Sequence, residues 1–251
     1  MSGPQTDMQG KSGQASDLAT FNEARYGQAN LTTEQVDRDP RIQFVLDLAR
    51  QSKAKRVLDV GCVDGFLAKD FKAMGMYVIG VDGSPSAIEV AKTRCDEAYV
   101  ADLGRQPLPI PDASVDLIWA GEIIEHIFDT ETFVEDLLRV AAPNALLILS
   151  TPNLASWINR ISIVLGAQPF FTEVGVRPSN AGSFLRKVTE PAGHIRNFTA
   201  SSLRHLLQSC GWRVEAIRGA CILVGKGRTI DRALGRIAPS LATDLVAVCR
   251  K

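Results

Sequence analysis

The stretch from residue 56 to residue 150 alternates short apolar runs with segments whose apolar residues have helical spacing. A short apolar run bounded by turn residues is typical of a strand that is buried on both faces. Strands separated by single helices must run parallel, because each helix returns the chain to the same end of the sheet. The pattern therefore predicts an α/β fold with a Rossmann-like, doubly wound sheet. Its predicted strands are residues 56–60, 77–81, 98–101, 115–120 and 145–150.

The segments around these strands carry the signals of helices. Ser84 followed by Pro85 is typical of a helix start, with Ser as the cap and Pro in the first turn. Gly211 is a typical helix end. On apolar spacing, the predicted helices are 41–50, 66–74, one that opens at Ser84, 133–141 and 203–211.

The alternation breaks after Thr151. Residues 152–198 form an apparent insertion that is apolar at first and then rich in Gly, Pro and Ser. Residues 212–217 and 245–249 follow as two strands without a clear crossover helix, which predicts an antiparallel closing pair on a mostly parallel sheet. We expect a disordered tail over residues 1–20 and a single domain over 21–251, with the insertion acting as a lid at about 152–198.

The composition narrows the class of protein. Lys plus Arg and Asp plus Glu are both 28, which gives a formal net charge of zero and argues against a general nucleic-acid binder. The five Cys form no CxxC pair, so neither a disulfide framework nor a Cys-based zinc site is indicated. The N-terminus lacks the features of a signal peptide and no apolar run is long enough to span a bilayer. These features predict a cytoplasmic protein.

Polar residues follow the predicted strands at the edge of the sheet where ligands of doubly wound folds bind. Gly61 and Gly65 allow a tight turn and a close approach of the backbone to a ligand. An acid after the second strand, Asp82, is placed to accept hydrogen bonds from ribose hydroxyls. Asp59 and Asp64 crowd the place where a dinucleotide would put its phosphates, and the GxGxxG pattern is missing. A cationic nucleoside without phosphate fits this loop better.

These residues resemble the motifs of class I S-adenosylmethionine-dependent methyltransferases. Residues 57–65 look like the first motif of that family, 80–85 like its second, and 108–112 like its Leu-Pro-x-Pro-Asp segment. Val63 departs from the usual middle Gly of the loop, and Asn144 stands where a Gly is common. The resemblance covers about residues 40–220 and implies a set of cofactor contacts: Asp59, Gly61, Cys62 and Gly65 at the methionine part, Asp82 and Gly83 at the ribose, and Asp102 and Leu103 at the adenine.

A second group of polar residues points to the methyl acceptor. If residues 122–126 are helical, Glu122, Glu125 and His126 share one face. With His194 they form a set that suits a divalent metal such as Mg²⁺, and Glu122 is also expected to face the cofactor. Without a metal, His126 or His194 could act as the base that deprotonates a hydroxyl group. The plainer alternatives are that Glu125 and His126 order a loop and that His194 makes a hydrogen bond at a helix start.

The expected function is S-adenosylmethionine-dependent O-methylation of a small hydroxylated or lipid-like acceptor, with His126, His194 and Glu122 as catalytic residues. The pattern around Glu125, His126 and His194 is similar to two subgroups, the ubiquinone-pathway O-methyltransferases and the small-RNA 2′-O-methyltransferases. The insertion looks more like the former, or like methionine-biosynthesis-associated methyltransferase-like proteins. RNA 2′-O-methylation and a non-catalytic, partner-binding role stay open. The apolar part of the insertion could also pack across the pocket, form a homodimer contact or touch a membrane.

Overall fold

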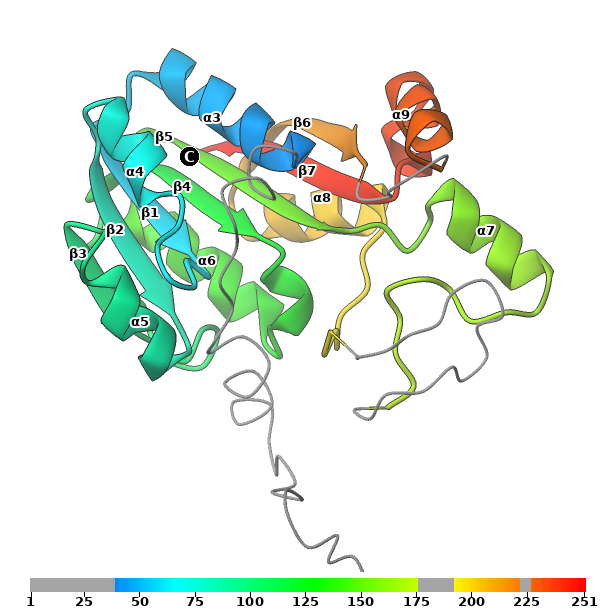
Figure 1. The fold of residues 1–251 in the computed structure, drawn as a ribbon, viewed down its shortest axis with the longest axis horizontal. Helices are drawn as coiled ribbons and strands as arrows, with labels where there is room; N and C mark the ends of the chain where they lie inside the picture. The colour runs from blue at the N-terminus through cyan, green and yellow to red at the C-terminus, as the bar shows by residue number, and fades with distance from the viewer. Residues whose placement is uncertain (1–38, 176–191, 222–226) are drawn as a thin grey trace, which may run out of the picture.

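The computed structural model describes residues 39–175, 192–221 and 227–251. The predicted tail, residues 1–20, and part of the predicted insertion lie outside these ranges. Seven strands form one sheet in the order β3-β2-β1-β4-β5-β7-β6 (Figure 1). The strands are β1 (Arg56–Val60), β2 (Tyr77–Asp82), β3 (Glu97–Val100), β4 (Val115–Gly121), β5 (Ala141–Pro152), β6 (Arg213–Ala220) and β7 (Asp244–Arg250).

The sheet is parallel except at β7, which confirms the predicted topology. Strands β1 to β5 pair parallel to their neighbours, whereas β7 runs antiparallel to both β5 and β6. The reversal occurs where the alternation of strands and helices breaks down in the sequence. It places the start of β7 beside the end of β5, because Asp244 pairs with Pro152.

Helices cover both faces of the sheet, so its core is double. Helices α3 (Pro40–Ser52), α4 (Ala68–Ala73) and α5 (Pro85–Ala91) pack on one face, where Val57, Val78 and Leu117 are buried. Helices α6 (Thr130–Val140) and α8 (Ala200–Ser209) pack on the other face, over Leu58, Ile79 and Ile118. Successive strand residues alternate between these two cores, as period-2 geometry requires. This double burial explains why the strands read as continuous apolar runs.

The predicted helix signals are confirmed in the structure. The Ser84 hydroxyl accepts the Ala87 N–H at 3.1 Å, and Pro85 is the first helical residue of α5. Gly211 follows the end of α8 with φ 94°, and α8 begins with a capping box of Thr199 and Ser202 that was not predicted. No helix in the described part of the chain is long and apolar enough to cross a membrane.

Two predicted boundaries were wrong. The sequence places Ala141 in a helix and begins the next strand at residue 145, but α6 ends at Val140 and β5 begins at Ala141. The pairing of Ala141 with Val115 outweighs the helical spacing.

The structure also has a helix, α9 (Gly227–Ile237), and a short 3₁₀ helix, η2 (Pro239–Leu241), between β6 and β7, where no clear helix was predicted. Within the insertion, residues Trp157–Val164 form α7.

Candidate active site

The loop after β1 is a tight turn against the end of β2. The Gly61 N–H donates to the Val81 carbonyl at 2.8 Å, and the loop continues through Gly65. Both glycines have positive φ, 75° and 72°. At Gly65 an added Cβ would lie 3.0 Å from the Cys95 sulfur, so the position has neither the conformation nor the space for a side chain. The two predicted glycine positions therefore shape the loop as expected.

Asp82 fixes this loop from the end of β2. One carboxylate oxygen accepts the Val63 N–H at 2.9 Å and the other accepts the Ser84 N–H at 2.8 Å. A carboxylate oxygen has more than one acceptor position, so Asp82 keeps the capacity to accept hydroxyl groups while it orders both loops.

Two carboxylates lie buried at the floor of the loop. Asp59 is 2% exposed and Asp64 is 5% exposed. Asp59 Oδ2 and Asp64 Oδ1 have no hydrogen-bond partner within the described residues, although Arg94 pairs with Asp64 Oδ2 at 2.6 Å. Burial, and then the nearby Asp82, raises the pKa of Asp59 to about 7. Buried acceptors without partners are costly, so this loop favours a ligand that brings positively charged donors.

The other residues predicted to contact a cofactor are placed in different ways. The Cys62 side chain is buried in the core beside Gly80, and burial raises the pKa of its thiol, so only its backbone belongs to the loop. Gly83 is exposed and stands between Asp82 and Ser84, whose N–H donates to the Asp82 carboxylate. Asp102 is half-exposed and lies 3.6 Å from Arg105, whereas Leu103 packs against the core.

Val63 adopts a backbone conformation that is unfavourable for a residue with a side chain. Its φ is 50°, in the left-handed region, and it is outside both hydrophobic cores. For a non-glycine residue this conformation costs about 1–2 kcal/mol. The backbone N–H to Asp82, which holds the loop, does not depend on the side chain.

Val63→Gly is therefore expected to raise the free energy of unfolding by about 1 kcal/mol, since relief of strain exceeds the roughly 0.5–1 kcal/mol entropic cost of glycine. Urea unfolding measures this change. Ala113→Gly is the matched control, because Ala113 has the same φ of 50° in the turn before β4, away from the loop. If Val63→Gly lowered the free energy of unfolding and Ala113→Gly did not, backbone strain at Val63 would be contradicted.

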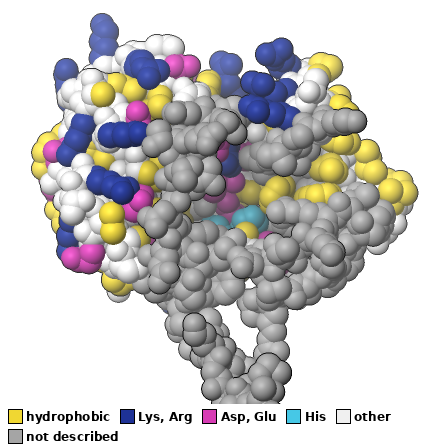
Figure 2. Space-filling model, viewed as in Figure 1, with side chains coloured by type: hydrophobic (Ala, Val, Ile, Leu, Met, Phe, Trp, Pro, Cys, Tyr) yellow, Lys and Arg dark blue, Asp and Glu magenta, His cyan; other side chains and the backbone are white. Residues whose placement is uncertain are grey.

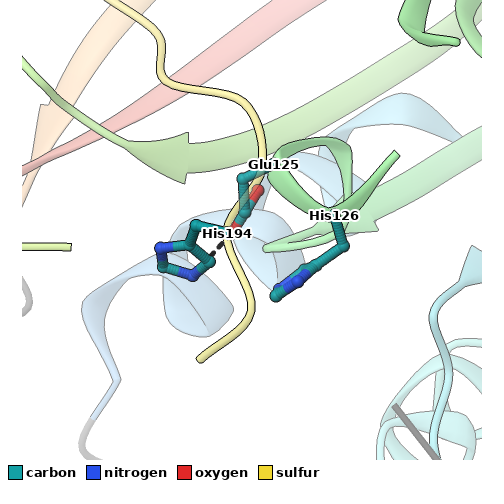
Figure 3. A group of neighbouring side chains, drawn as sticks. All are labelled: Glu125, His126 and His194. Carbon is teal, nitrogen blue, oxygen red and sulfur yellow. Dashed lines mark ion pairs between the residues drawn. The ribbon is translucent and has the colours of Figure 1, made fainter. Parts of the chain in front are cut away.

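The second polar group gathers where β4 ends. The 3₁₀ helix η1 (Ile124–His126) follows β4 directly and buries Glu125 and His126. His194 joins them from the segment before α8 (Figure 3). One ligand atom from each of these three side chains lies within 4.8 Å of the others. Figure 2 shows histidine and acidic side chains side by side near the centre of this face.

Hydrogen bonds fix how the two imidazoles are presented. His194 Nδ1 lies 2.9 Å from the Phe171 carbonyl, and His126 Nδ1 lies 3.2 Å from the Gly193 carbonyl. A carbonyl can only accept, so each Nδ1 carries a proton, and in the neutral form of either ring the lone pair is on Nε2. His194 Nε2 lies 4.0 Å from Glu125 Oε1. Burial, and then the nearby His194, lowers the pKa of His126 to about 4, so that ring is neutral at physiological pH.

Glu125 is the buried acid of this cluster. It is 1% exposed, and its Oε2 accepts the Thr151 hydroxyl at 3.0 Å. Its Oε1 has no hydrogen-bond partner within the described residues. Burial, and then the Glu122 carboxylate, raises the pKa of Glu125 well above its ordinary value. The site is thus built to receive a proton, a donor or a cation at Oε1.

Glu122 does not join the other three predicted ligands. Its backbone turns through the left-handed region, with φ 54°. Its Oε2 pairs with Arg41 at 2.7 Å and its Oε1 accepts the Ser150 hydroxyl at 2.7 Å. Arg41 also pairs with the fully buried Asp244 at 2.8 Å. Sequence reasoning missed Arg41 and Asp244, because neither belongs to a motif and 203 residues separate them.

The two polar groups are neighbours. A Cβ added at Gly61 would lie 3.3 Å from Ile123 Cδ1, and Ile123 sits between Glu122 and Glu125. The loop that favours a cationic ligand therefore touches the segment that carries the Glu and His residues. One edge of the sheet holds both a cofactor-like cradle and a candidate catalytic cluster.

Known proteins share this sequence pattern and this fold. A family model described as a methyltransferase domain matches residues 58–149. A protein of Mycolicibacterium smegmatis described as a probable S-adenosylmethionine-dependent methyltransferase is 28% identical over 172 residues, which cover 68% of this chain and 57% of the relative. The mitochondrial ubiquinone biosynthesis O-methyltransferase of Schizosaccharomyces pombe is 27% identical over 193 residues, which cover 72% and 64%. The chain thus spans less than two thirds of the length of these curated relatives.

A solved structure agrees on the fold. The S-adenosylmethionine-dependent methyltransferase of Mesorhizobium loti superposes with a TM-score of 0.58 at 16% identity, over 86% of this chain and all of that one. The chain thus combines a match to a methyltransferase family model with three structural features. These are the loop after β1, Asp82 at the end of β2 and the antiparallel β7. Residues 58–149 thus match a methyltransferase domain, and the chain is similar to S-adenosylmethionine-dependent methyltransferases in sequence and in fold.

Proposed function

We propose that this protein transfers a methyl group from S-adenosylmethionine to the hydroxyl group of a small hydroxylated or lipid-like acceptor. The observation that supports this most is the cluster of Glu125, His126 and His194, because Ile123, two residues before Glu125, lies against the loop after β1. Fold alone does not fix the reaction, so the proposal rests on these side chains. The ubiquinone biosynthesis O-methyltransferases among the relatives are consistent with a hydroxyl acceptor.

The loop after β1 offers hydrogen-bond acceptors that suit the positively charged groups of S-adenosylmethionine. Asp59 Oδ2 and Asp64 Oδ1 are buried acceptors without partners, and the cofactor carries an ammonium group and a sulfonium centre. Asp82 would accept the ribose hydroxyls, while Leu103 and Asp102 would border the adenine. When bound, the cofactor supplies an electrophilic methyl group. The role of the chain is then to hold the acceptor oxygen in line and to exclude water.

The histidines support proton removal from the acceptor. In the neutral form of each ring the lone pair is on Nε2, because each Nδ1 donates to a backbone carbonyl. A neutral imidazole beside the acceptor hydroxyl would take its proton as a general base, which typically accelerates such a step by about 10²–10⁴-fold. The buried Glu125 carboxyl, whose Oε1 lies 4.0 Å from His194 Nε2, would stabilise the imidazolium that results.

A divalent cation is the alternative way to activate the hydroxyl. Glu125, His126 and His194 would hold it, and its chemistry would be that of a Lewis acid that lowers the pKa of the hydroxyl. Two imidazole nitrogens and one carboxylate oxygen favour ions such as Mn²⁺, Co²⁺ or Zn²⁺ over Mg²⁺, which prefers oxygen ligands. The Arg41 and Ser150 partners of Glu122 leave that residue outside the set.

Calorimetry and an acceptor screen test the proposed function. S-Adenosylhomocysteine is titrated into the purified protein first, and binding is expected. A panel of catechols, phenols, hydroxylated lipids and a 3′-terminal RNA oligonucleotide is then scored for S-adenosylhomocysteine release. Turnover on a catechol, phenol or hydroxylated lipid supports the proposal. Turnover on the RNA alone, or failure to bind S-adenosylhomocysteine, would overturn it and favour RNA methylation or a partner-binding role, respectively.

A further inference from the structure

His194 is held by a turn that precedes it by more than twenty residues. Its Nδ1 donates to the carbonyl of Phe171, at 2.9 Å and a sequence separation of 23. Phe171 is a non-glycine residue with φ 64°. A strained backbone at a site of this kind persists only where its surroundings hold it in place. The turn formed by residues 170–173 therefore fixes the tautomer of His194 through the carbonyl of a residue with left-handed φ.

Glu173 binds the backbone on which His194 stands. Its Oε2 accepts the His194 N–H at 2.9 Å, and its Oε1 accepts the Ala192 N–H at 3.2 Å. Oε1 also lies 4.0 Å from His194 Nδ1. The Glu173 side chain is only 14% exposed, so these charge-assisted hydrogen bonds are protected from water. One carboxylate thus bridges two successive points of the segment that delivers the imidazole.

The turn itself is anchored to the core. Phe170 N–H donates to Asn159 Oδ1 at 2.7 Å, and Asn159 is 1% exposed in α7. Asn159 Nδ2 donates to the Asn153 carbonyl at 3.1 Å, just beyond the end of β5. A continuous set of hydrogen bonds therefore runs from the sheet through α7 to the turn, and from the turn to His194. Glu173 is the charged member of this set that contacts the residue-194 backbone.

We propose that Glu173 is a positioning residue that keeps His194 Nε2 directed at Glu125. It acts by holding residues 192–194 against the turn, so that Nδ1 stays on the Phe171 carbonyl. This inference rests on the proposed function of the Glu125, His126 and His194 cluster. It adds a residue that touches none of the reacting atoms and that no motif in the sequence singles out.

The test compares Glu173→Gln with Glu173→Asp. The Gln amide keeps one acceptor but turns an NH₂ group toward a backbone N–H, whereas Asp keeps both acceptor oxygens on a shorter side chain. We expect kcat to fall about tenfold in Glu173→Gln, with KM and the affinity for S-adenosylhomocysteine changed less than twofold. Glu173→Asp should recover most of kcat. Glu89→Gln, on the exposed face of α5, is the matched control and should leave kcat unchanged.

A double-mutant cycle separates positioning from general stability. In the His194→Ala background, Glu173→Gln should have little further effect on kcat, because the group that it positions is gone. The same loss of kcat in both backgrounds would overturn the positioning role, since it would show that Glu173 acts independently of His194.

Spectra of protein carrying ¹⁵N-labelled histidine give a readout that does not depend on turnover. His194, assigned by its loss in His194→Ala, should appear as the Nδ1–H tautomer in the wild type and as a mixture of tautomers in Glu173→Gln. An unchanged tautomer in Glu173→Gln would overturn the inference. If His194→Ala keeps wild-type turnover, the proposed function of the cluster fails instead, and the tautomer alone then decides the role of Glu173.

Discussion

Asp59→Asn is expected to stabilise the ligand-free protein above pH 7 while it weakens the binding of S-adenosylhomocysteine about 10- to 100-fold. Both effects have one cause. Asp59 is fully buried with an unpaired Oδ2, so its negative charge is costly until a positively charged ligand compensates it. Removing the charge removes the cost and the ligand contact together.

The stability effect has a defined pH dependence. Burial, and then Asp82, raises the pKa of Asp59 from 3.8 to about 7. Between these values the folded protein keeps a proton that the unfolded chain has lost, so the free energy of unfolding falls by about 1.4 kcal/mol per pH unit as the pH rises. Above the folded pKa both states have lost the proton and the difference stays constant. Asn does not titrate, so the variant escapes this loss.

At pH 8 the free energy of unfolding of Asp59→Asn should exceed that of the wild type by roughly 1–3 kcal/mol. The gain is smaller than the full electrostatic effect, because burial of the Asn amide is itself costly. Urea unfolding at pH 5, 6, 7 and 8 measures it, and the gap between variant and wild type should widen up to pH 7. Asp116→Asn is the control at the opposite end of the sheet. There the carboxylate accepts two backbone N–H groups from Lys55 and Arg56, so its removal should destabilise the protein.

Calorimetry measures the binding effect. The affinity of the wild type for S-adenosylhomocysteine should rise about tenfold from pH 6 to pH 8 as Asp59 loses its proton, whereas that of Asp59→Asn should not. 5′-Methylthioadenosine, which lacks the amino-acid part, should bind wild type and variant alike. Equal loss of affinity for both nucleosides would contradict a contact between Asp59 and the amino-acid part.

The fold was readable from the sequence because its strands are buried on both faces. Such strands are continuous apolar runs, and the residues that start and stop helices, such as Ser84 and Gly211, act locally. The boundary between α6 and β5 was missed, because the pairing of Ala141 with Val115 is a long-range contact. Helix α9 was missed although Ile230, Leu234 and Ile237 have helical spacing, because two Arg residues lie between them.

The conformation of the loop after β1 was predictable for a similar reason, because Gly61 and Gly65 are close in sequence and both have positive φ in the turn. The second cluster is different. Its predicted member Glu122 is drawn away by a left-handed backbone and by Arg41, a residue of α3. The Glu173 turn that holds His194 acts through a backbone carbonyl and backbone N–H groups, for which a sequence has no side-chain signal.

The combined His126→Ala/His194→Ala replacement is expected to lower turnover about 10²–10⁴-fold while it leaves the affinity for S-adenosylhomocysteine within threefold of the wild type. The reason is that both Nε2 lone pairs are lost, whereas Asp59, Asp82 and the glycine loop are untouched. Each single replacement should cost nearly as much as the pair, because residues that act as a unit are not additive. Turnover is measured as S-adenosylhomocysteine release with the acceptor found in the screen.

His205→Ala is the matched control, since the third histidine of the chain is exposed on α8 and lies outside the cluster. Wild-type turnover in the double replacement would contradict the assignment of the acceptor site. Dialysis of the wild type against a chelator then separates the two ways of activating the hydroxyl. Turnover that survives dialysis assigns the histidines as bases. The other outcome is that turnover is lost on dialysis and restored by Mn²⁺, Co²⁺ or Zn²⁺ in the wild type but not in the double replacement. That result assigns the two histidines and Glu125 as metal ligands, because the cation then needs the same two Nε2 atoms.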